Sequence, residues 1–148
     1  MIIEIMIRYL HFLGIFVVVG SLIGEHLLLK RVMTRTEIKR LARLDTIYGV
    51  AFLVVLVCGF LMWFVVGKPA DFYSFNWIFH LKVGLLIIMG LLSIVPTLFF
   101  WRNKKGEGSE LVEVPTSLKI YIRLELLILF LTPLLATLMA RGIGFFGE

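Results

Sequence analysis

The sequence predicts an all-α integral membrane protein, a four-helix bundle forming one transmembrane domain over residues 1–148. Of the 148 residues, 60% are hydrophobic and only 17% are charged, a composition typical of membrane proteins rather than of soluble cores. Long stretches of the chain also carry no charge, as a membrane span requires. We expect the helices at about residues 3–33, 36–66, 74–102 and 117–143.

The first expected helix is apolar but carries ionisable residues at intervals. These are Glu4, Arg8, His11, Glu25 and His26. The chain has no basic segment before its first apolar stretch and no small-residue cleavage site. We therefore expect a retained helix rather than a signal peptide.

The second expected helix contains an uncharged run over residues 46–67. This run reaches the ~20 residues that span ~30 Å of hydrocarbon. Thr34 and Glu37 have the spacing of a capping box, which predicts that the helix begins inside the preceding loop. Gly67-Lys68-Pro69 ends the helix, as glycine and proline commonly do.

The third expected helix is uncharged over residues 83–101, but the fourth only over residues 126–140. At ~1.5 Å per residue the latter run is too short to cross, so the fourth helix must include charged residues at its ends. Pro96 and Pro133 fall inside these helices, where prolines usually kink a membrane helix. The glycine-containing segment 104–116 predicts a long mobile loop.

Two loop regions hold most of the positive charge. Their basic residues are Lys30, Arg31, Arg35, Lys39, Arg40 and Arg43 in one, and Arg102, Lys104, Lys105, Lys119 and Arg123 in the other. The positive-inside rule then predicts cytoplasmic loops and periplasmic termini for a multi-pass protein of the bacterial inner membrane. No nucleic-acid-binding motif accompanies the charge, so we expect no nucleic-acid partner.

Histidines in apolar helices are the most informative residues for function, because an imidazole in hydrocarbon usually serves a metal, a haem, a proton path or an ion pair. At ~1.5 Å per residue, His11 lies ~12 Å and His80 ~9 Å below the outer ends of their helices. Arg8, Lys82 and Arg141 lie in the same outer layer. A haem fits this layer, because its iron takes imidazole ligands and its propionates take arginine or lysine.

Several arrangements of these residues remain open. His80 and Lys82 are about 200° apart around a helix, so they cannot both point at one centre. Either His80 binds the metal and Lys82 reaches sideways, or Lys82 faces the bundle and His80 faces a neighbour or lipid. Arg8 could instead pair with Glu4 at i, i+4, and His11 could bond to the backbone of a neighbouring helix.

A second polar layer is expected at the cytoplasmic ends of the helices. It consists of Glu25, His26, Arg43, Asp45, Arg123 and Glu125. We expect ion pairs here that hold the helix ends together, with a second haem-binding position at His26 as the alternative. His11 and His26 are ~22 Å apart along one helix, so they cannot share a metal but could serve two stacked sites.

Four segments carry a resemblance to known proteins. They are Tyr9-Leu10-His11-Phe12-Leu13-Gly14, Glu25-His26-Leu27-Leu28-Leu29-Lys30, Arg43-Leu44-Asp45-Thr46-Ile47-Tyr48-Gly49 and Phe79-His80-Leu81-Lys82. Over nearly the whole chain they resemble a family of small bacterial four-helix membrane proteins of unassigned function. That family is similar to the copper-resistance-D-like and membrane-bound protoporphyrinogen oxidase group, four-helix proteins that contain haem b.

The resemblance implies that haem b is bound through His11 and that Lys82 has a catalytic role. We therefore expect a b-type haem protein acting in electron transfer or as an oxidoreductase, with a quinone or porphyrin substrate. His11 and His80 are the expected iron ligands. Arg8, Lys82 and Arg141 are the expected contacts of the propionates or of a substrate anion.

Two other functions fit the same residues. The first is proton or metal translocation without haem, along His11, Lys82, Asp45 and Glu125. The second is a structural membrane subunit, in which the polar residues only hold helices together. In each case we expect a homo-oligomer in the lipid bilayer, because Gly20 and Gly24 form a small-xxx-small pair on one helix.

Overall fold

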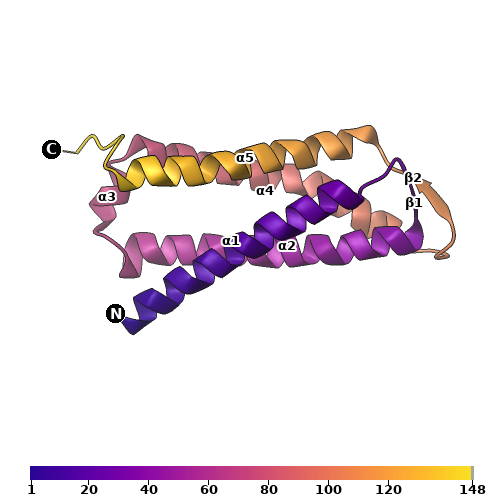
Figure 1. Cartoon of the computed structure of the whole chain (residues 1–148), viewed down its shortest axis with the longest axis horizontal. Helices are drawn as coiled ribbons and strands as arrows, with labels where there is room; N and C mark the ends of the chain where they lie inside the picture. The colour runs from indigo at the N-terminus through magenta and orange to yellow at the C-terminus, as the bar shows by residue number, and fades with distance from the viewer. Residues whose placement is uncertain (148) are drawn as a thin grey trace.

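The chain folds into long helices and one short antiparallel pair of strands, as the computed structural model shows for residues 1–147 (Figure 1). The elements are α1 (Ile2–Leu28), β1 (Val32–Thr34), α2 (Arg35–Leu61), the π-helical turn η1 (Met62–Val66), α3 (Ala70–Ser74), α4 (Trp77–Asn103), β2 (Leu111–Glu113) and α5 (Thr116–Ala140). The start of α1 and the end of α5 lie at one end of the molecule, here called the terminal end. The pair of strands β1 and β2, called the hairpin below although the strands are distant in sequence, lies at the other end, here called the hairpin end.

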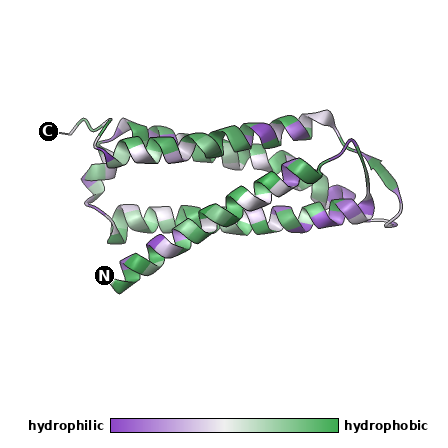
Figure 2. Cartoon of the chain, in the orientation of Figure 1, coloured by the Kyte–Doolittle hydropathy of each residue, from purple (hydrophilic) through white to green (hydrophobic). Residues whose placement is uncertain are grey.

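Within residues 1–147, four helical segments are long and apolar enough to cross a membrane: α1, α2 continued by η1, α4 and α5. Their outer faces carry large apolar side chains, such as Phe16 with 72% of its surface exposed and Phe130 with 64%. Such a surface suits lipid rather than water. Figure 2 shows hydrophobic residues along the helices and many hydrophilic ones near the hairpin. The predicted all-α membrane bundle is confirmed.

The bundle is well packed at the hairpin end and more open at the terminal end. Near the hairpin, all four long helices contribute fully buried side chains to one core, among them Leu22, Ile38, Phe100 and Ile122. The first half of α1 diverges from the other helices (Figure 1), and Ile3 there is 68% exposed. A smaller core at the terminal end joins η1, α3, α4 and α5.

The hairpin corrects two expectations from the sequence. The first helix was expected to reach about residue 33, but α1 ends at Leu28. The expected mobile loop at 104–116 contains β2, which pairs antiparallel with β1 so that Met33 lies opposite Val112. Because the two strands lie far apart in the chain, no local pattern marks their pairing.

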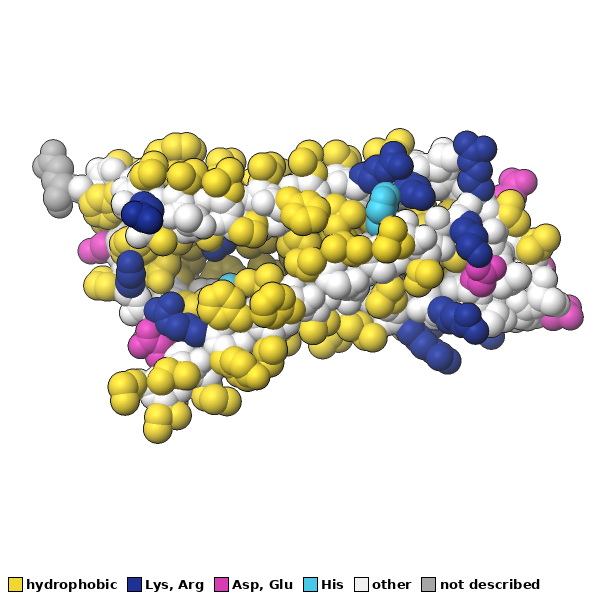
Figure 3. All heavy atoms as spheres, viewed as in Figure 1, with side chains coloured by type: hydrophobic (Ala, Val, Ile, Leu, Met, Phe, Trp, Pro, Cys, Tyr) yellow, Lys and Arg dark blue, Asp and Glu magenta, His cyan; other side chains and the backbone are white. Residues whose placement is uncertain are grey.

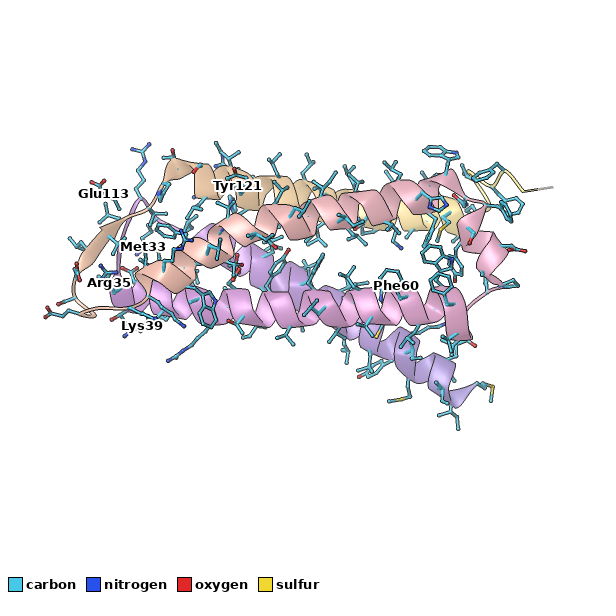
Figure 4. All side chains as sticks on the ribbon, turned by 180° about the vertical axis from the view of Figure 1, so that it is seen from behind. Met33, Arg35, Lys39, Phe60, Glu113 and Tyr121 are labelled. Atoms are coloured by element: carbon cyan, nitrogen blue, oxygen red, sulfur yellow. The ribbon has the colours of Figure 1, made fainter. Side chains whose placement is uncertain are left out.

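Arg35 fastens this hairpin to the helices. Its Nε donates a hydrogen bond to Glu110 Oε2 at 2.8 Å, and its Nη1 donates to the Asn103 carbonyl oxygen at 2.7 Å. The Arg35 side chain also lies against Gly106, whose φ of +130° and close packing both require glycine. Figure 4 labels Arg35 and Met33 at the hairpin end. One side chain thus links the start of α2 to the end of α4 and to the strand connection.

The ends of α2 follow the sequence prediction. Thr34 Oγ1 accepts from the Glu37 amide at 3.2 Å and the Glu37 carboxylate accepts from the Thr34 amide, which confirms the capping box. At the other end the chain turns back after η1, and a Cβ at Gly67 would lie only 1.9 Å from the Met62 carbonyl oxygen. Glycine is therefore required where the helix stops.

The start of α4 lies three residues later than expected, at Trp77 rather than at residue 74. The buried Asn76 side chain caps the helix by accepting from the Ile78 amide at 2.9 Å, and it donates to the Ile143 carbonyl oxygen at 3.1 Å. This residue therefore ties the chain after α5 to the start of α4. The α5 helix ends at Ala140 rather than at residue 143.

The hairpin is expected to lose stability in acid through Glu110. Hydrogen bonds from the Arg35 guanidinium, and its charge, hold the pKa of Glu110 below its usual range. A carboxyl group whose pKa is lowered on folding stabilises the fold above its unfolded pKa, and this stabilisation is lost as pH falls through the folded pKa. Glu110→Gln should therefore weaken hydrogen-exchange protection of the β1 and β2 amides at neutral pH. In acid, where Glu110 is itself protonated, it should have little effect.

The matched control is Glu107→Gln, because among the described residues the Glu107 carboxylate accepts only from the nearby Ser109 hydroxyl. It should leave hairpin protection unchanged at both pH values. Equal loss of protection by Glu110→Gln at neutral and acid pH would contradict this account.

Candidate functional site

His11 lies on the side of α1 that meets α2. Its ring is half-buried, and Nδ1 donates a hydrogen bond to the Val55 carbonyl oxygen at 3.0 Å. Because a carbonyl oxygen can only accept, Nδ1 carries the proton, and the neutral ring keeps its lone pair on Nε2. The backbone contact considered from the sequence is confirmed. It leaves Nε2 available, which is how histidine ligands are oriented in metal sites.

A close approach of the two helices places this histidine. A Cβ at Gly14 would lie 2.7 Å from Val55 Cγ2 and 3.4 Å from the Ala51 carbonyl oxygen. Gly14 follows His11 by three residues, so both lie on neighbouring parts of one helix face. A Cβ at Gly59 would lie 3.8 Å from His11 Cε1, so this glycine of α2 leaves room beside the ring. The contact that packs α1 on α2 therefore also sets the position of His11.

The glycines expected to pack helices behave differently from one another. A Cβ at Gly24 would lie 2.9 Å from Leu44 Cδ2, so this position is tight. A Cβ at Gly20 would meet nothing within 4 Å among the described residues. Of the three glycines of α1, Gly14 and Gly24 are thus the ones packed tightly against α2.

The structure separates Lys82 from His80, as their spacing requires. Lys82 is half-buried and close enough to His11 to interact with it electrostatically. Within residues 1–147 it forms no salt bridge. His80 is exposed, and its Nε2 donates to the Ser74 carbonyl oxygen at 2.8 Å. Of the two arrangements considered, the one with Lys82 facing the bundle is present.

The two outer arginines are exposed at the terminal end. Arg8 Nη2 lies 2.9 Å from Glu4 Oε1, one helical turn away, so the pairing considered from the sequence is formed. Arg141 follows the last residue of α5, and its side chain is exposed. Neither guanidinium is buried inside the bundle beside His11.

The surface is hollowed between the α1–α2 pair and the α4–α5 pair, in the half of the molecule near the terminal end (Figure 3). Basic and histidine side chains are visible within this hollow. His11 on α1 and Lys82 on α4 come from the two pairs, and they interact electrostatically. These two residues are called the outer site below.

The ion pairs predicted for the inner layer are wrong. Glu25, Asp45 and Glu125 are buried, with 1%, 3% and 1% of their surfaces exposed, whereas Arg43 and Arg123 are exposed. No salt bridge within residues 1–147 involves any of the five. The reason is spacing: each arginine precedes its acid by two residues, about 200° around the helix, so it faces away when the acid faces inward.

The three acids instead lie near one another, together with a tyrosine that the sequence did not single out. Tyr48 is 2% exposed and lies close enough to Glu25, Asp45 and Glu125 to interact electrostatically with each. Thr97 of α4 donates to Asp45 Oδ2 at 2.7 Å. The three acids and Tyr48 are called the acid cluster below. The spacing of Tyr48, three residues after Asp45 on one helix face, is the signal that could have found it.

The side chains around His26 are basic, unlike those of the acid cluster. The basic side chains of Lys119 and Arg123 on α5 lie near it. Its Nδ1 is buried and has no hydrogen-bond partner among the described residues. His26 is thus a half-buried histidine in basic surroundings at the hairpin end, far from the outer site.

Comparison with known proteins finds one family. Its model, described as a predicted membrane protein (DUF2214), matches residues 3–144 and so covers all four long helices. Neither the curated proteins nor the solved structures contain a match. The expected membership of a small membrane protein family without an assigned function is confirmed.

The packing at Gly14 can be tested with a pair of identical substitutions. Gly14→Leu places a side chain against Val55 and the α2 backbone, and we expect it to destabilise the protein by about 1–3 kcal/mol. Gly20→Leu faces open space and should change stability by less than about 0.5 kcal/mol. Thermal unfolding in detergent, followed by circular dichroism, measures both. Equal effects of the two substitutions would show that α1 does not cross α2 at Gly14.

Proposed function

We propose that this chain, which belongs to the DUF2214 family of predicted membrane proteins, binds b-type haem and acts in electron transfer. The observation that carries the proposal is the hydrogen bond from His11 Nδ1 to the Val55 carbonyl oxygen at 3.0 Å. It leaves the lone pair of Nε2 free to bind a ligand. An imidazole held in this way inside a helical membrane bundle is poised to bind a metal.

The residues around His11 suit a haem better than a bare ion. A porphyrin supplies four nitrogen ligands itself, so one half-buried histidine is enough to hold its iron from one side. The hollow beside the outer site lies in the part of the bundle where the core is least complete (Figure 3). Lys82 brings a half-buried positive charge to this place, and a propionate is the anion that would neutralise it.

The chain's own groups have distinct roles in this proposal. Bound haem supplies one-electron exchange at its iron. His11 would be the residue that holds the iron, and its hydrogen bond to Val55 keeps the ring from turning. Lys82 is the proposed catalytic residue: beside a propionate, it would donate a proton to an oxygen of a quinone substrate or attract a carboxylate of a porphyrin substrate. Arg8, which pairs with Glu4 in this structure, and Arg141 would turn inward from the rim to contact the propionates.

His80 is the proposed second iron ligand. In this structure it is exposed and bonded to Ser74, so it reaches the iron either after releasing that bond or from a second copy of the chain. The second route requires the homo-oligomer predicted from the sequence. His26, at the other end of α1, is proposed only as a ligand of a second haem.

The proposed orientation places the hairpin end in the cytoplasm and the outer site toward the periplasm of the bacterial inner membrane. A groove of about 550 Å³ at the hairpin end supports it. Its lining includes Lys39, Arg43, Lys104 and Lys105 beside Trp101, which suits the anionic lipid headgroups of the cytoplasmic leaflet.

An absorption spectrum tests the proposal. The protein, expressed with added haem precursor and purified in detergent, should show Soret and α bands after reduction with dithionite. His11→Ala should abolish both bands because the iron loses its oriented ligand. A colourless native protein would rule out haem binding.

Two further variants distinguish the proposed roles of the three histidines. His26→Ala is the matched control, since His26 lies at the hairpin end, and it should leave the bands of a single haem unchanged. His80→Ala should keep the pigment but change the band shape from that of a six-coordinate to that of a five-coordinate iron. If His26→Ala removes the bands and His11→Ala does not, the haem lies at the hairpin end instead.

A further inference from the structure

The acid cluster is a second polar centre, which the proposed haem site does not use. Glu25 comes from α1, Asp45 and Tyr48 from α2, and Glu125 from α5. All four side chains are at least nine-tenths buried. Thr97 adds a contact from α4, so all four long helices meet at this point.

The cluster contains more hydrogen-bonding groups than the bundle satisfies. Glu25 Oε1, Glu125 Oε1 and the Tyr48 hydroxyl are buried and have no hydrogen-bond partner within residues 1–147. Buried polar atoms are nearly always paired, and an isolated carboxylate in a low-dielectric interior is especially unfavourable. Three such atoms on neighbouring side chains therefore indicate a ligand that the side chains themselves do not supply.

The basic side chains near the acid cluster do not supply this ligand either. Arg43 and Arg123, the basic residues nearest in sequence on α2 and α5, are exposed. His26 on α1 lies toward Lys119 and Arg123 rather than forming a salt bridge with the acids. From α4 the cluster receives only the neutral hydroxyl of Thr97. The missing partner is thus positively charged and comes from outside the chain.

The contact between Glu25 and Asp45 identifies the partner. The two side chains are neighbours on α1 and α2, close enough to interact electrostatically. Two carboxyl groups side by side in a low-dielectric interior repel each other unless at least one of them carries a proton. Thr97 donates to Asp45 Oδ2 at 2.7 Å, which favours the ionised form of Asp45, so we assign the proton to Glu25.

We propose that Glu25, Asp45, Glu125 and Tyr48 form a proton-binding site inside the membrane, in which Glu25 and Asp45 share one proton. Glu125 and the Tyr48 hydroxyl extend the site toward α5. Glu25 lies three residues before the end of α1, so the proton exchanges with water at the hairpin end. The site is ~21 Å from His11 along α1, at ~1.5 Å per residue, and is independent of haem binding.

Infrared spectroscopy of the whole protein in lipid nanodiscs tests the proposal. A protonated carboxyl group has a carbonyl stretching band that is separate from the bands of carboxylates, and it shifts to lower frequency in D2O. We expect such a band at pH 7 in the native protein. Glu25→Gln should remove it, because the proton donor of the shared pair is lost.

The matched control is Glu107→Gln, the same substitution at an exposed loop residue, which should leave the band unchanged. Thr97→Val keeps both carboxyl groups and removes only the bond to Asp45, so it should shift the frequency of the band without removing it. This variant also keeps the test decisive if Glu25→Gln fails to fold, as judged by circular dichroism.

Two outcomes would overturn the proposal. One is the lack of a protonated-carboxyl band in the native protein at pH 7. The other is loss of the band on addition of Na⁺, K⁺, Mg²⁺ or Ca²⁺, which would show that the carboxyl groups bind a metal cation instead. Neither outcome depends on whether the protein contains haem, so failure here and failure of the proposed function are distinguishable.

Discussion

The constraint on which the structure depends is that hydrocarbon offers no hydrogen bonds, so polar groups within the membrane must find partners inside the protein. The backbone meets it by forming four long helices, and the strands β1 and β2 and the isolated bridge between Asn76 and Phe145 lie outside the spans. Side chains meet it at a few contacts between helices. His11 bonds to the α2 backbone and Thr97 bonds to Asp45. The polar groups that lack such partners mark the candidate sites.

The two polar centres satisfy this constraint to different degrees. In the outer site, one nitrogen of His11 is held by a carbonyl while the other is free, and Lys82 has no salt-bridge partner among the described residues. In the acid cluster, three buried oxygens lack partners. We therefore propose a ligand with both a metal and an anionic group for the outer site, and a proton for the acid cluster. Their positions on α1, separated by about half the helix, let one small bundle hold both.

Much of the fold could be predicted because the relevant signals are local. Uncharged runs located the spans, and Thr34 with Glu37 located the start of α2. The end of α1 and the hairpin could not be predicted, because β1 and β2 are distant in sequence and only their pairing makes them strands. The inner ion pairs were wrongly expected because charges were matched by depth alone. Arg43 and Asp45 lie at one depth but on opposite sides of α2.

The sequence by itself determined that this chain is a membrane bundle of four apolar helices, because length and hydrophobicity decide whether a helix can cross a bilayer. It also supplied the residues of the outer site, since histidine and lysine are conspicuous in apolar helices. Only the tertiary structure decided that Lys82 faces inward while His80 faces outward, and that Tyr48 and Thr97 join the acids. The physical reason is that a side chain's direction depends on how its helix is rotated against its neighbours. That rotation is set by packing contacts such as Gly14 against Val55, which come from different helices.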